Sequence, residues 1–182
     1  MTHSSWGRRR RGGLRVIHYF AYGSNLSSAQ MIARMGPFPA AFGRPRIARL
    51  AGFRLAFNMR GETGQIYANI VQPGEEVMGV VYGCAEEALE KMDRFEFGYH
   101  RERVEVVREG GDVIEAVTYV AEAGHVVEGG SPGEEYLQRI LRGGREHGLP
   151  ESYLRQIAAL LPRPHTIGAE EGGVIRKSKT QG

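Results

Sequence analysis

Four short apolar runs, separated by residues that favour turns, occupy residues 46–84. They read RIARLAG, FRLAFN, QIYANIV and EVMGVVYGC, and the segments MRGETG and QPGE stand between the last three. Short apolar runs at this spacing are typical of antiparallel strands. The pattern therefore predicts a four-stranded meander that can curl into a small barrel.

The segment before these runs has the pattern of a strand, a turn and a helix. Residues 14–22 are rich in Leu, Val, Ile, Tyr and Phe and lie between glycines, as a buried strand does. Ser27 suits a helix N-cap, and Met31, Ile32 and Met35 recur at the spacing of one helix face. We therefore expect a helix that ends at Met35.

Helical and extended patterns alternate after the four runs. Residues 85–96 have a helical period and begin with acidic residues, which favour a helix N-terminus. Residues 101–107 and 112–121 alternate as half-exposed strands do, with Gly110-Gly111-Asp112 as the hairpin turn between them.

Two further helices are predicted in the last third of the chain. Residues 133–148 and 150–161 each carry an apolar face of helical period. Gly148 suits a left-handed helix end, and Pro150 suits the first turn of the next helix.

One domain is expected, because a chain of 182 residues lies in the usual range for a single core. Its predicted bounds are residues 14–165. Residues 1–13 are interpreted as a disordered basic arm, and residues 166–182 as an extended or disordered tail.

The apolar runs and the cysteine content also bear on the compartment. Cys84, the single cysteine, stands in an apolar run, which predicts a buried thiol and leaves no partner for a disulfide within the chain. No run approaches the roughly 20 apolar residues of a membrane span, and no secretory signal is recognised. We therefore expect a cytoplasmic protein with no membrane contact.

Charge is distributed unevenly along the chain. Residues 1–61 contain eleven arginines and no acid, so the remaining residues carry a net −8 and the whole chain +3. In one folded domain these segments interleave, so a pI of 9.2 does not by itself indicate a nucleic-acid partner. The run Arg8–Arg11 is the exception, and an anionic partner for it remains the weakest of three functional hypotheses.

Gly23, Ser24 and Asn25 stand where the first predicted strand gives way to a helix. One interpretation is a tight turn with a capping residue. The other is a loop whose free backbone N–H groups hold a carboxylate, a phosphate or an oxyanion. The spacing matches neither the phosphate-binding loop nor the dinucleotide fingerprint, so no nucleotide site is predicted.

Glu96 lies in the segment KMDRFEFGYHRERV, among Phe95, Phe97 and Tyr99. A carboxylate in aromatic surroundings has a raised pKa, which suits a general base. Alternatively, Asp93 and Arg94 form surface pairs and Glu96 is merely exposed. No His, Cys, Asp or Glu pattern with metal-ligand spacing occurs, so no bound metal is expected.

These motifs, in this order, resemble the γ-glutamylcyclotransferase family. The resemblance rests on YFAYGSNLSSAQM, FRLAFN, ANIVQPGEEVMGVVY, MDRFEFGYHR and GREHGLPESYLRQI, and extends from about Val16 to Leu161. It implies an α+β fold, a small mixed β-barrel with flanking helices. It also implies cleavage of a γ-glutamyl amide by its own α-amine to give 5-oxoproline and a free amine or amino acid, without metal or cofactor.

The resemblance further implies roles for individual residues. Glu96 matches the family's catalytic acid/base. The residues expected to bind the glutamyl part of the substrate are Tyr22, the backbone N–H groups of Gly23, Ser24, Asn25 and Leu26, and the pocket residue Tyr99.

The partner implied is a small γ-glutamyl molecule, and a homodimer is compatible with the sequence. The substrate remains open between a γ-glutamyl amino acid, a γ-glutamylamine and an acylated biosynthetic intermediate. The alternative to an enzyme is a binding module that uses the same anion-holding loop for a small metabolite or a protein, without turnover.

Overall fold

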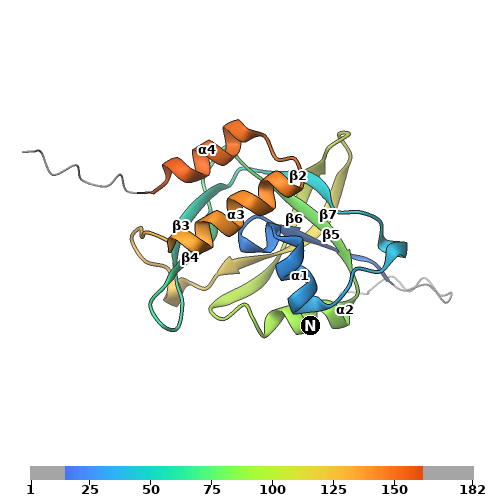
Figure 1. The fold of residues 1–182 in the computed structure, drawn as a ribbon, viewed down its shortest axis with the longest axis horizontal. Helices are drawn as coiled ribbons and strands as arrows, with labels where there is room; N and C mark the ends of the chain where they lie inside the picture. The colour runs from blue at the N-terminus through green and yellow to red at the C-terminus, as the bar shows by residue number, and fades with distance from the viewer. Residues whose placement is uncertain (1–14, 162–182) are drawn as a thin grey trace, which may run out of the picture.

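A closed five-stranded β-barrel forms the centre of the computed structural model, which describes residues 15–161 (Figure 1). Its strands follow the order β1-β5-β2-β6-β7 around the barrel. Strand β1 pairs with β7 in parallel and the other neighbours are antiparallel, so the sheet is mixed. The bounds are β1 (Ile17–Ala21), β2 (Arg46–Ala51), β5 (Glu76–Cys84), β6 (Tyr99–Arg108) and β7 (Val113–Ala121).

The prediction of a four-stranded meander is wrong in its pairing. Strands β3 (Arg54–Arg60) and β4 (Ile66–Val71) form a separate two-stranded sheet, while β2 pairs with β5 and β6. The side chain of Asn69 on β4 accepts a hydrogen bond from the backbone of Ala121 on β7, which ties this hairpin to the barrel. Alternating hydrophobicity identifies a strand and its buried face, but it does not identify the partner strand.

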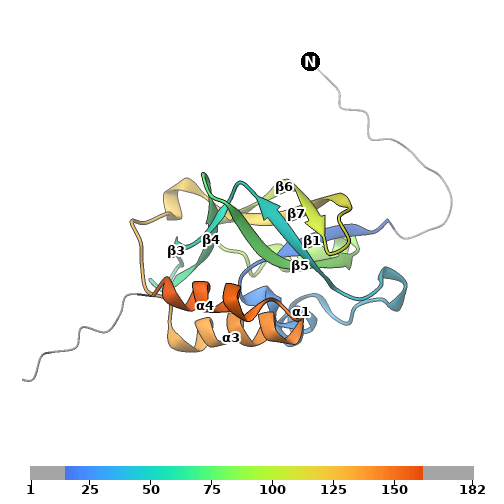
Figure 2. The same cartoon turned by 90° about the horizontal axis from the view of Figure 1, so that it is seen from above.

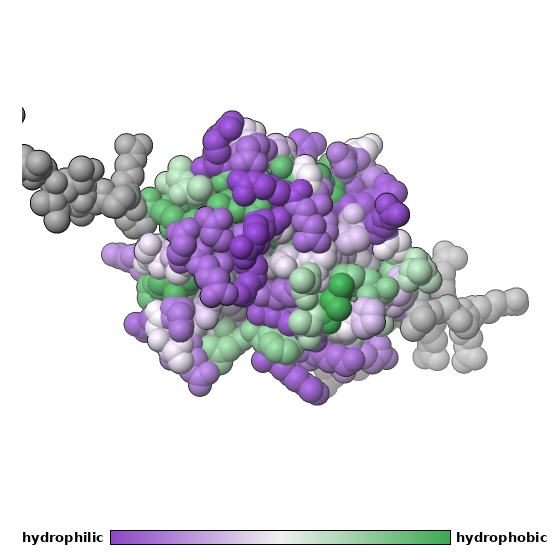
Figure 3. Space-filling model, viewed as in Figure 1, coloured by the Kyte–Doolittle hydropathy of each residue, from purple (hydrophilic) through white to green (hydrophobic). Residues whose placement is uncertain are grey.

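Three helices lie in one layer along one side of the barrel (Figure 2). They are α1 (Ser28–Met35), α3 (Glu134–Glu146) and α4 (Glu151–Ala159). Their buried side chains, among them Met31, Ile140 and Leu154, join the core, and the outward side of α3 is mostly hydrophilic (Figure 3). Helix α2 (Glu86–Asp93) contacts α1. The layer therefore covers the end of β1 and the turn that follows it.

Several local predictions are confirmed. Ser27 caps α1, since its Oγ accepts a hydrogen bond from the backbone N–H of Gln30 at 3.4 Å. The turn before β7 closes with a 2.9 Å bond from Arg108 N to the carbonyl of Asp112, and Gly148 ends α3 with a φ of 81°. Pro150 differs slightly, because it is the N-cap of α4 rather than part of its first turn.

Cys84 is buried at the end of β5, as expected of a small apolar residue. Burial raises the pKa of its thiol to about 12, so the thiol stays protonated. Within residues 15–161 no helix is both long and apolar enough to cross a membrane. The predicted arm of residues 1–13, with Arg8–Arg11, and the tail of residues 166–182 lie outside the described residues.

Candidate active site

A cavity of about 340 Å³ opens where β1 runs into the helical layer. The residues that border it come from β1 and the turn after it, α1, the β3–β4 hairpin, the segment from α2 into β6, β7 and α3. The residues bordering it include Tyr22, Gly23, Ser24, Asn25, Glu96 and Tyr99, which the sequence selects as site residues. Segments far apart in the sequence thus meet at one place.

The turn after β1 is a short 3-10 helix, η1 (Ser24–Leu26). Gly23 precedes it, and a Cβ there would lie 3.3 Å from the Ala68 Cβ and 3.5 Å from the Tyr136 hydroxyl, so the backbone approaches its neighbours closely. Among the described residues, the N–H groups of Gly23, Ser24 and Asn25 have no hydrogen-bond partner. The start of η1 therefore presents free donors beside the cavity.

Leu26 is arranged differently from the other residues of the motif. Its N–H donates to the carbonyl of Gly23 at 3.0 Å, and its side chain is fully buried away from the cavity lining. The backbone donor that the resemblance assigns to Leu26 is thus already used inside the turn.

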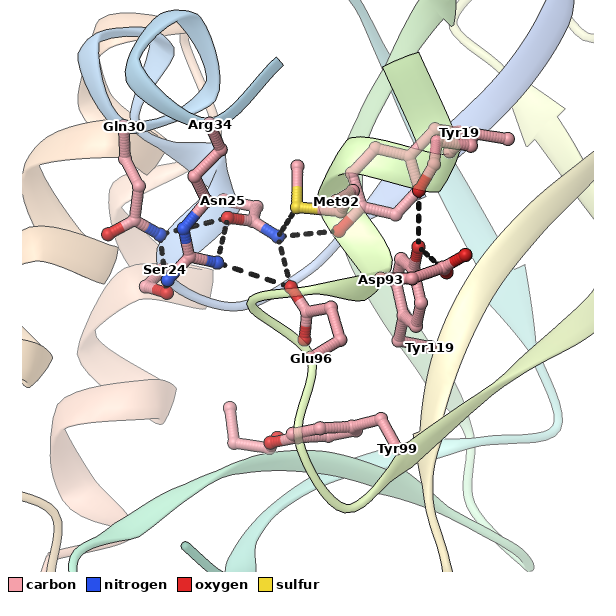
Figure 4. Close-up of polar contacts among 12 residues, drawn as sticks. Tyr19, Ser24, Asn25, Gln30, Arg34, Met92, Asp93, Glu96, Tyr99 and Tyr119 are labelled. Carbon is pink, nitrogen blue, oxygen red and sulfur yellow. Dashed lines mark hydrogen bonds and ion pairs between the residues drawn. The ribbon is translucent and has the colours of Figure 1, made fainter. Parts of the chain in front are cut away.

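Asn25 is the central contact of the site (Figure 4). Its side-chain Nδ2 donates to Glu96 Oε1 at 2.9 Å and to the Tyr19 hydroxyl at 2.8 Å. Its Oδ1 accepts from Gln30 Nε2 at 2.8 Å and from Arg34 Nη1 at 3.0 Å. With Asn25 only 6% exposed, these bonds fix the amide and turn its N–H₂ toward the carboxylate.

Glu96 is held by two donors. Besides Asn25, Arg34 Nη1 lies 3.2 Å from the same Oε1, and the Glu96 side chain is 11% exposed. Burial raises the pKa of Glu96 above its ordinary value, because the charged form loses hydration. The Arg34 charge and the Asn25 hydrogen bond oppose this effect only in part.

The interpretation that Glu96 is merely exposed is therefore wrong, because its side chain is only 11% exposed. The pKa is raised, in the direction expected of a carboxylate among aromatic residues. Asp93 forms the surface pair, with Arg101, and Glu96 does not share it. Phe95 and Phe97 are about half exposed and Tyr99 is partly buried, and all three line the cavity together with Glu96. Burial raises the pKa of Glu96, whose side chain points toward η1 and bonds to Asn25. The sequence around Glu96 does not show this contact.

The tyrosines of the site have engaged hydroxyls. Tyr22 donates to the carbonyl of Tyr119 at 2.6 Å, and Tyr99 donates to the carbonyl of Ala68 at 2.6 Å. Burial raises the pKa of both Tyr22 and Tyr99, so both stay neutral. They can shape the cavity and bind a ligand, but they cannot accept a proton as phenolates.

The sequence interpretation missed three polar residues that support the site. Gln30 donates to Ser24 Oγ at 2.8 Å as well as to Asn25, Arg34 bridges Asn25 and Glu96, and Arg139 on α3 donates to Gln30 Oε1 at 2.9 Å. The available signal was the i, i+4 spacing of Gln30 and Arg34, which places both on one face of α1. In the described part of the chain, no group of His, Cys, Asp or Glu has the arrangement of a metal site.

Comparison with known proteins identifies the family of this chain. A sequence model of the family described as "Gamma-glutamyl cyclotransferase, AIG2-like" matches residues 19–138. Gamma-glutamylcyclotransferase of Homo sapiens is 34% identical over 175 residues, covering 90% of this chain and 89% of that protein. The Mus musculus protein of the same name is 30% identical with the same coverage.

A solved structure gives the same result for the fold. The structure of a protein named gamma-glutamyl cyclotransferase superimposes with a TM-score of 0.69 at 29% identity, covering 84% of this chain and 92% of that one. The mixed α+β barrel with flanking helices is thus shared. The chain belongs to the AIG2-like gamma-glutamyl cyclotransferase family.

Proposed function

We propose that this protein cleaves a γ-glutamyl amide by attack of the substrate's own α-amine on its γ-carbonyl, releasing 5-oxoproline and an amine or amino acid. One observation carries the proposal: a buried carboxylate, Glu96, lines the same cavity as a turn whose backbone N–H groups are free. The names of the relatives support the same reaction.

Glu96 acts as the base in this proposal. An α-amino group has a reference pKa near 8, so it is largely protonated at neutral pH and cannot attack until its proton is removed. The raised pKa of Glu96 makes it a stronger base than an exposed glutamate. Its partners Asn25 and Arg34 hold one oxygen, Oε1, in place.

The same carboxyl group then acts as the acid. The amine nitrogen forms a bond to the γ-carbonyl carbon, and the resulting tetrahedral oxyanion collapses as the bond from that carbon to the leaving nitrogen breaks. Two protons leave the α-nitrogen in all, because its ammonium form becomes the N–H of 5-oxoproline. Glu96 releases the first to solvent before attack, then takes the second from the attacking nitrogen of the intermediate and passes it to the leaving nitrogen, which departs as a neutral amine. Protons then balance, and Glu96 ends as the carboxylate that it was.

The free N–H groups of Gly23, Ser24 and Asn25 are proposed to bind the glutamyl α-carboxylate. Unpaired backbone donors at a helix start attract an anion. Holding the carboxylate there folds the glutamyl chain so that its amine and γ-carbonyl meet, and such orientation contributes several kcal/mol to a cyclisation. Tyr22 and Tyr99 would complete the glutamyl pocket.

The test is a panel of γ-glutamyl amino acids and γ-glutamylamines, with 5-oxoproline followed by mass spectrometry. The parent protein should form 5-oxoproline from at least one member, and Glu96→Gln should lower kcat by about a hundredfold or more. Glu90→Gln, an exposed glutamate on α2, is the matched control and should retain parental rates.

The binding-module hypothesis makes a different prediction for the same panel. A module raises its melting temperature with γ-glutamyl ligands, because a ligand that binds only the folded state stabilises it, yet it forms no 5-oxoproline. Stabilisation without product would therefore reject the enzyme. A folded Glu96→Gln protein with normal turnover would instead remove Glu96 from the mechanism.

A further inference from the structure

Two half-exposed aromatic rings border the mouth of the cavity, one on each side of Glu96 in the sequence. Phe95 is 52% exposed and Phe97 is 51% exposed, and both line the cavity. Exposed apolar surface gathered beside a cavity can mark a ligand-binding groove. Neither ring has a part in the proton transfers proposed above.

Each ring packs against one neighbouring side chain. The Arg34 guanidinium lies 5.2 Å from the centre of the Phe95 ring. The His125 ring meets Phe97 edge to face, with the ring centres 5.0 Å apart. Each ring is thus fixed by one contact while another part of it stays uncovered.

The backbone turns sharply at Gly98, between the exposed side chain of Phe97 and the more buried side chain of Tyr99. Gly98 has a φ of +75°, and a Cβ there would lie 2.5 Å from Met59 Cε. This turn lets Tyr99 begin β6 and point into the site, while Phe97 stays at the mouth. The backbone conformation at Gly98 therefore sets the position of Phe97.

The charges at the mouth do not favour a carboxylate on the leaving group. Arg34 is paired with Glu96, and Arg139 lies 3.0 Å from Glu135, so both guanidinium groups that border the cavity already face a carboxylate. Glu62, in the β3–β4 turn, adds a negative charge to the same rim. Apolar contact with Phe95 and Phe97 is therefore a means of selecting the leaving group that needs no unpaired positive charge.

We propose that Phe95 and Phe97 form the leaving-group subsite, and that the protein prefers γ-glutamyl amides whose amine carries an aromatic or bulky apolar arm. This inference rests on the proposed function and names the substrate class of the same site. The arm packs against the open parts of the two rings while the glutamyl part occupies the turn after β1.

The first test compares γ-glutamyl-phenethylamide with γ-glutamyl-ethylamide, which differ only by a phenyl ring. The ratio of their kcat/KM values should favour the phenethylamide by about tenfold, the scale of a well-placed aromatic pair. In Phe97→Ala this ratio should fall to near one. Val113→Ala, which shortens an exposed apolar side chain at the start of β7, should keep the parental ratio.

A second pair, γ-glutamyl-phenylalanine and γ-glutamyl-alanine, asks whether a carboxylate on the leaving group changes the preference. The phenyl ring should be favoured in this pair too, and both members should react more slowly than the matching amides. Equal kcat/KM values within the first pair, or an unchanged ratio in Phe97→Ala, would overturn the inference.

Failure of the proposed function would look different. If none of the four compounds gave 5-oxoproline, the melting temperature would still report on the subsite. The phenethylamide should then stabilise the parent protein more than the ethylamide does, and Phe97→Ala should abolish the difference. Equal stabilisation by the two amides would reject the subsite independently of any turnover.

Discussion

Asp93 and Glu96 are three residues apart, and each is paired with an arginine, yet their pKa values move in opposite directions. Asp93 accepts two hydrogen bonds from Arg101, at 2.9 and 2.8 Å, and one from the Tyr119 hydroxyl at 2.7 Å. Partial burial raises the pKa of Asp93, but these bonds and the Arg101 charge outweigh it, so the pKa lies below its ordinary value.

Glu96 shows the reverse balance. Its burial raises its pKa more than Arg34 and Asn25 lower it. The side chain of Asp93 is 45% exposed and that of Glu96 only 11%. The comparison shows that an arginine partner does not decide the protonation of a carboxylate by itself. Burial and the number of hydrogen bonds together decide whether the carboxylate stays an anion, as at Asp93, or has the raised pKa that suits the proton carrier proposed at Glu96.

The largest expected effect is the difference in kcat between variants of the two carboxylates. Glu96→Gln should lower kcat by about a hundredfold or more, because it removes the proton carrier. Asp93→Asn should cause a much smaller loss, since the Asp93 side chain does not line the cavity and its charge is the smallest influence on the pKa of Glu96. The backbone carbonyl of Asp93, which accepts the Glu96 N–H at 3.2 Å, is unchanged in this variant. Steady-state rates of 5-oxoproline formation measure both. Equal losses of kcat in the two variants would mean that the difference in burial between Asp93 and Glu96 does not give them different roles.

Replacing Arg34 and Arg101 tests how each arginine affects the pKa of its carboxylate partner. Arg34→Met should move the acidic limb of the kcat/KM profile to higher pH, because Arg34 lowers the pKa of Glu96 and its loss lets that pKa rise further. Arg101→Met should leave the limb in place, since Arg101 acts on Asp93. Arg34→Lys restores a charge and should return the limb toward its parental position. A limb that moves to lower pH in Arg34→Met would contradict this assignment.

The sequence predicted most of the elements, because their signals are local. Ser27 capped the expected helix, and the glycine-rich turn at residues 110–112 joined the expected strands. The pairing of β2 with β5 and β6 was not predictable from those signals, since the order of strands depends on contacts across many residues.

In the candidate site, too, the local motifs were predictable and the long-range contacts were not. Glu96 and the Gly23-Ser24-Asn25 turn were selected from their motifs, and the structure brings them together around one cavity. The Asn25–Glu96 bond joins residues 71 positions apart, and the Arg34–Glu96 contact joins residues 62 apart. Hydrophobic periodicity says nothing about such pairs, so neither the role of Arg34 nor the inward direction of Glu96 could be read from the chain.

The pH dependence of stability should also differ in sign between the two carboxylates. Asp93, with a lowered pKa, contributes stability above about pH 3.9, its unfolded value, and this is lost as pH falls through its folded pKa. Glu96, with a raised pKa, contributes stability that is fully present below about pH 4.3 and is lost as pH rises through its folded pKa.

Melting temperatures of the parent protein, Asp93→Asn and Glu96→Gln across pH 3–8 test these signs. The advantage of the parent over Asp93→Asn should shrink as pH falls. The advantage of the parent over Glu96→Gln should shrink as pH rises. Parallel curves for the parent and Glu96→Gln would show that folding leaves the pKa of Glu96 unshifted.

The smallest expected effect concerns the hydroxyl of Tyr119 on β7, which donates a hydrogen bond to Asp93. Tyr119→Phe removes one hydrogen bond to Asp93 Oδ1 and should lower the free energy of unfolding by about 1 kcal/mol. A double-mutant cycle with Asp93→Asn isolates this bond, because the loss from Tyr119→Phe should be smaller once the charged acceptor is gone. Strict additivity would mean that Arg101 alone holds Asp93. A large fall in turnover in Tyr119→Phe would mean that the two carboxylates share one network, and that Asp93 helps to set the protonation of Glu96.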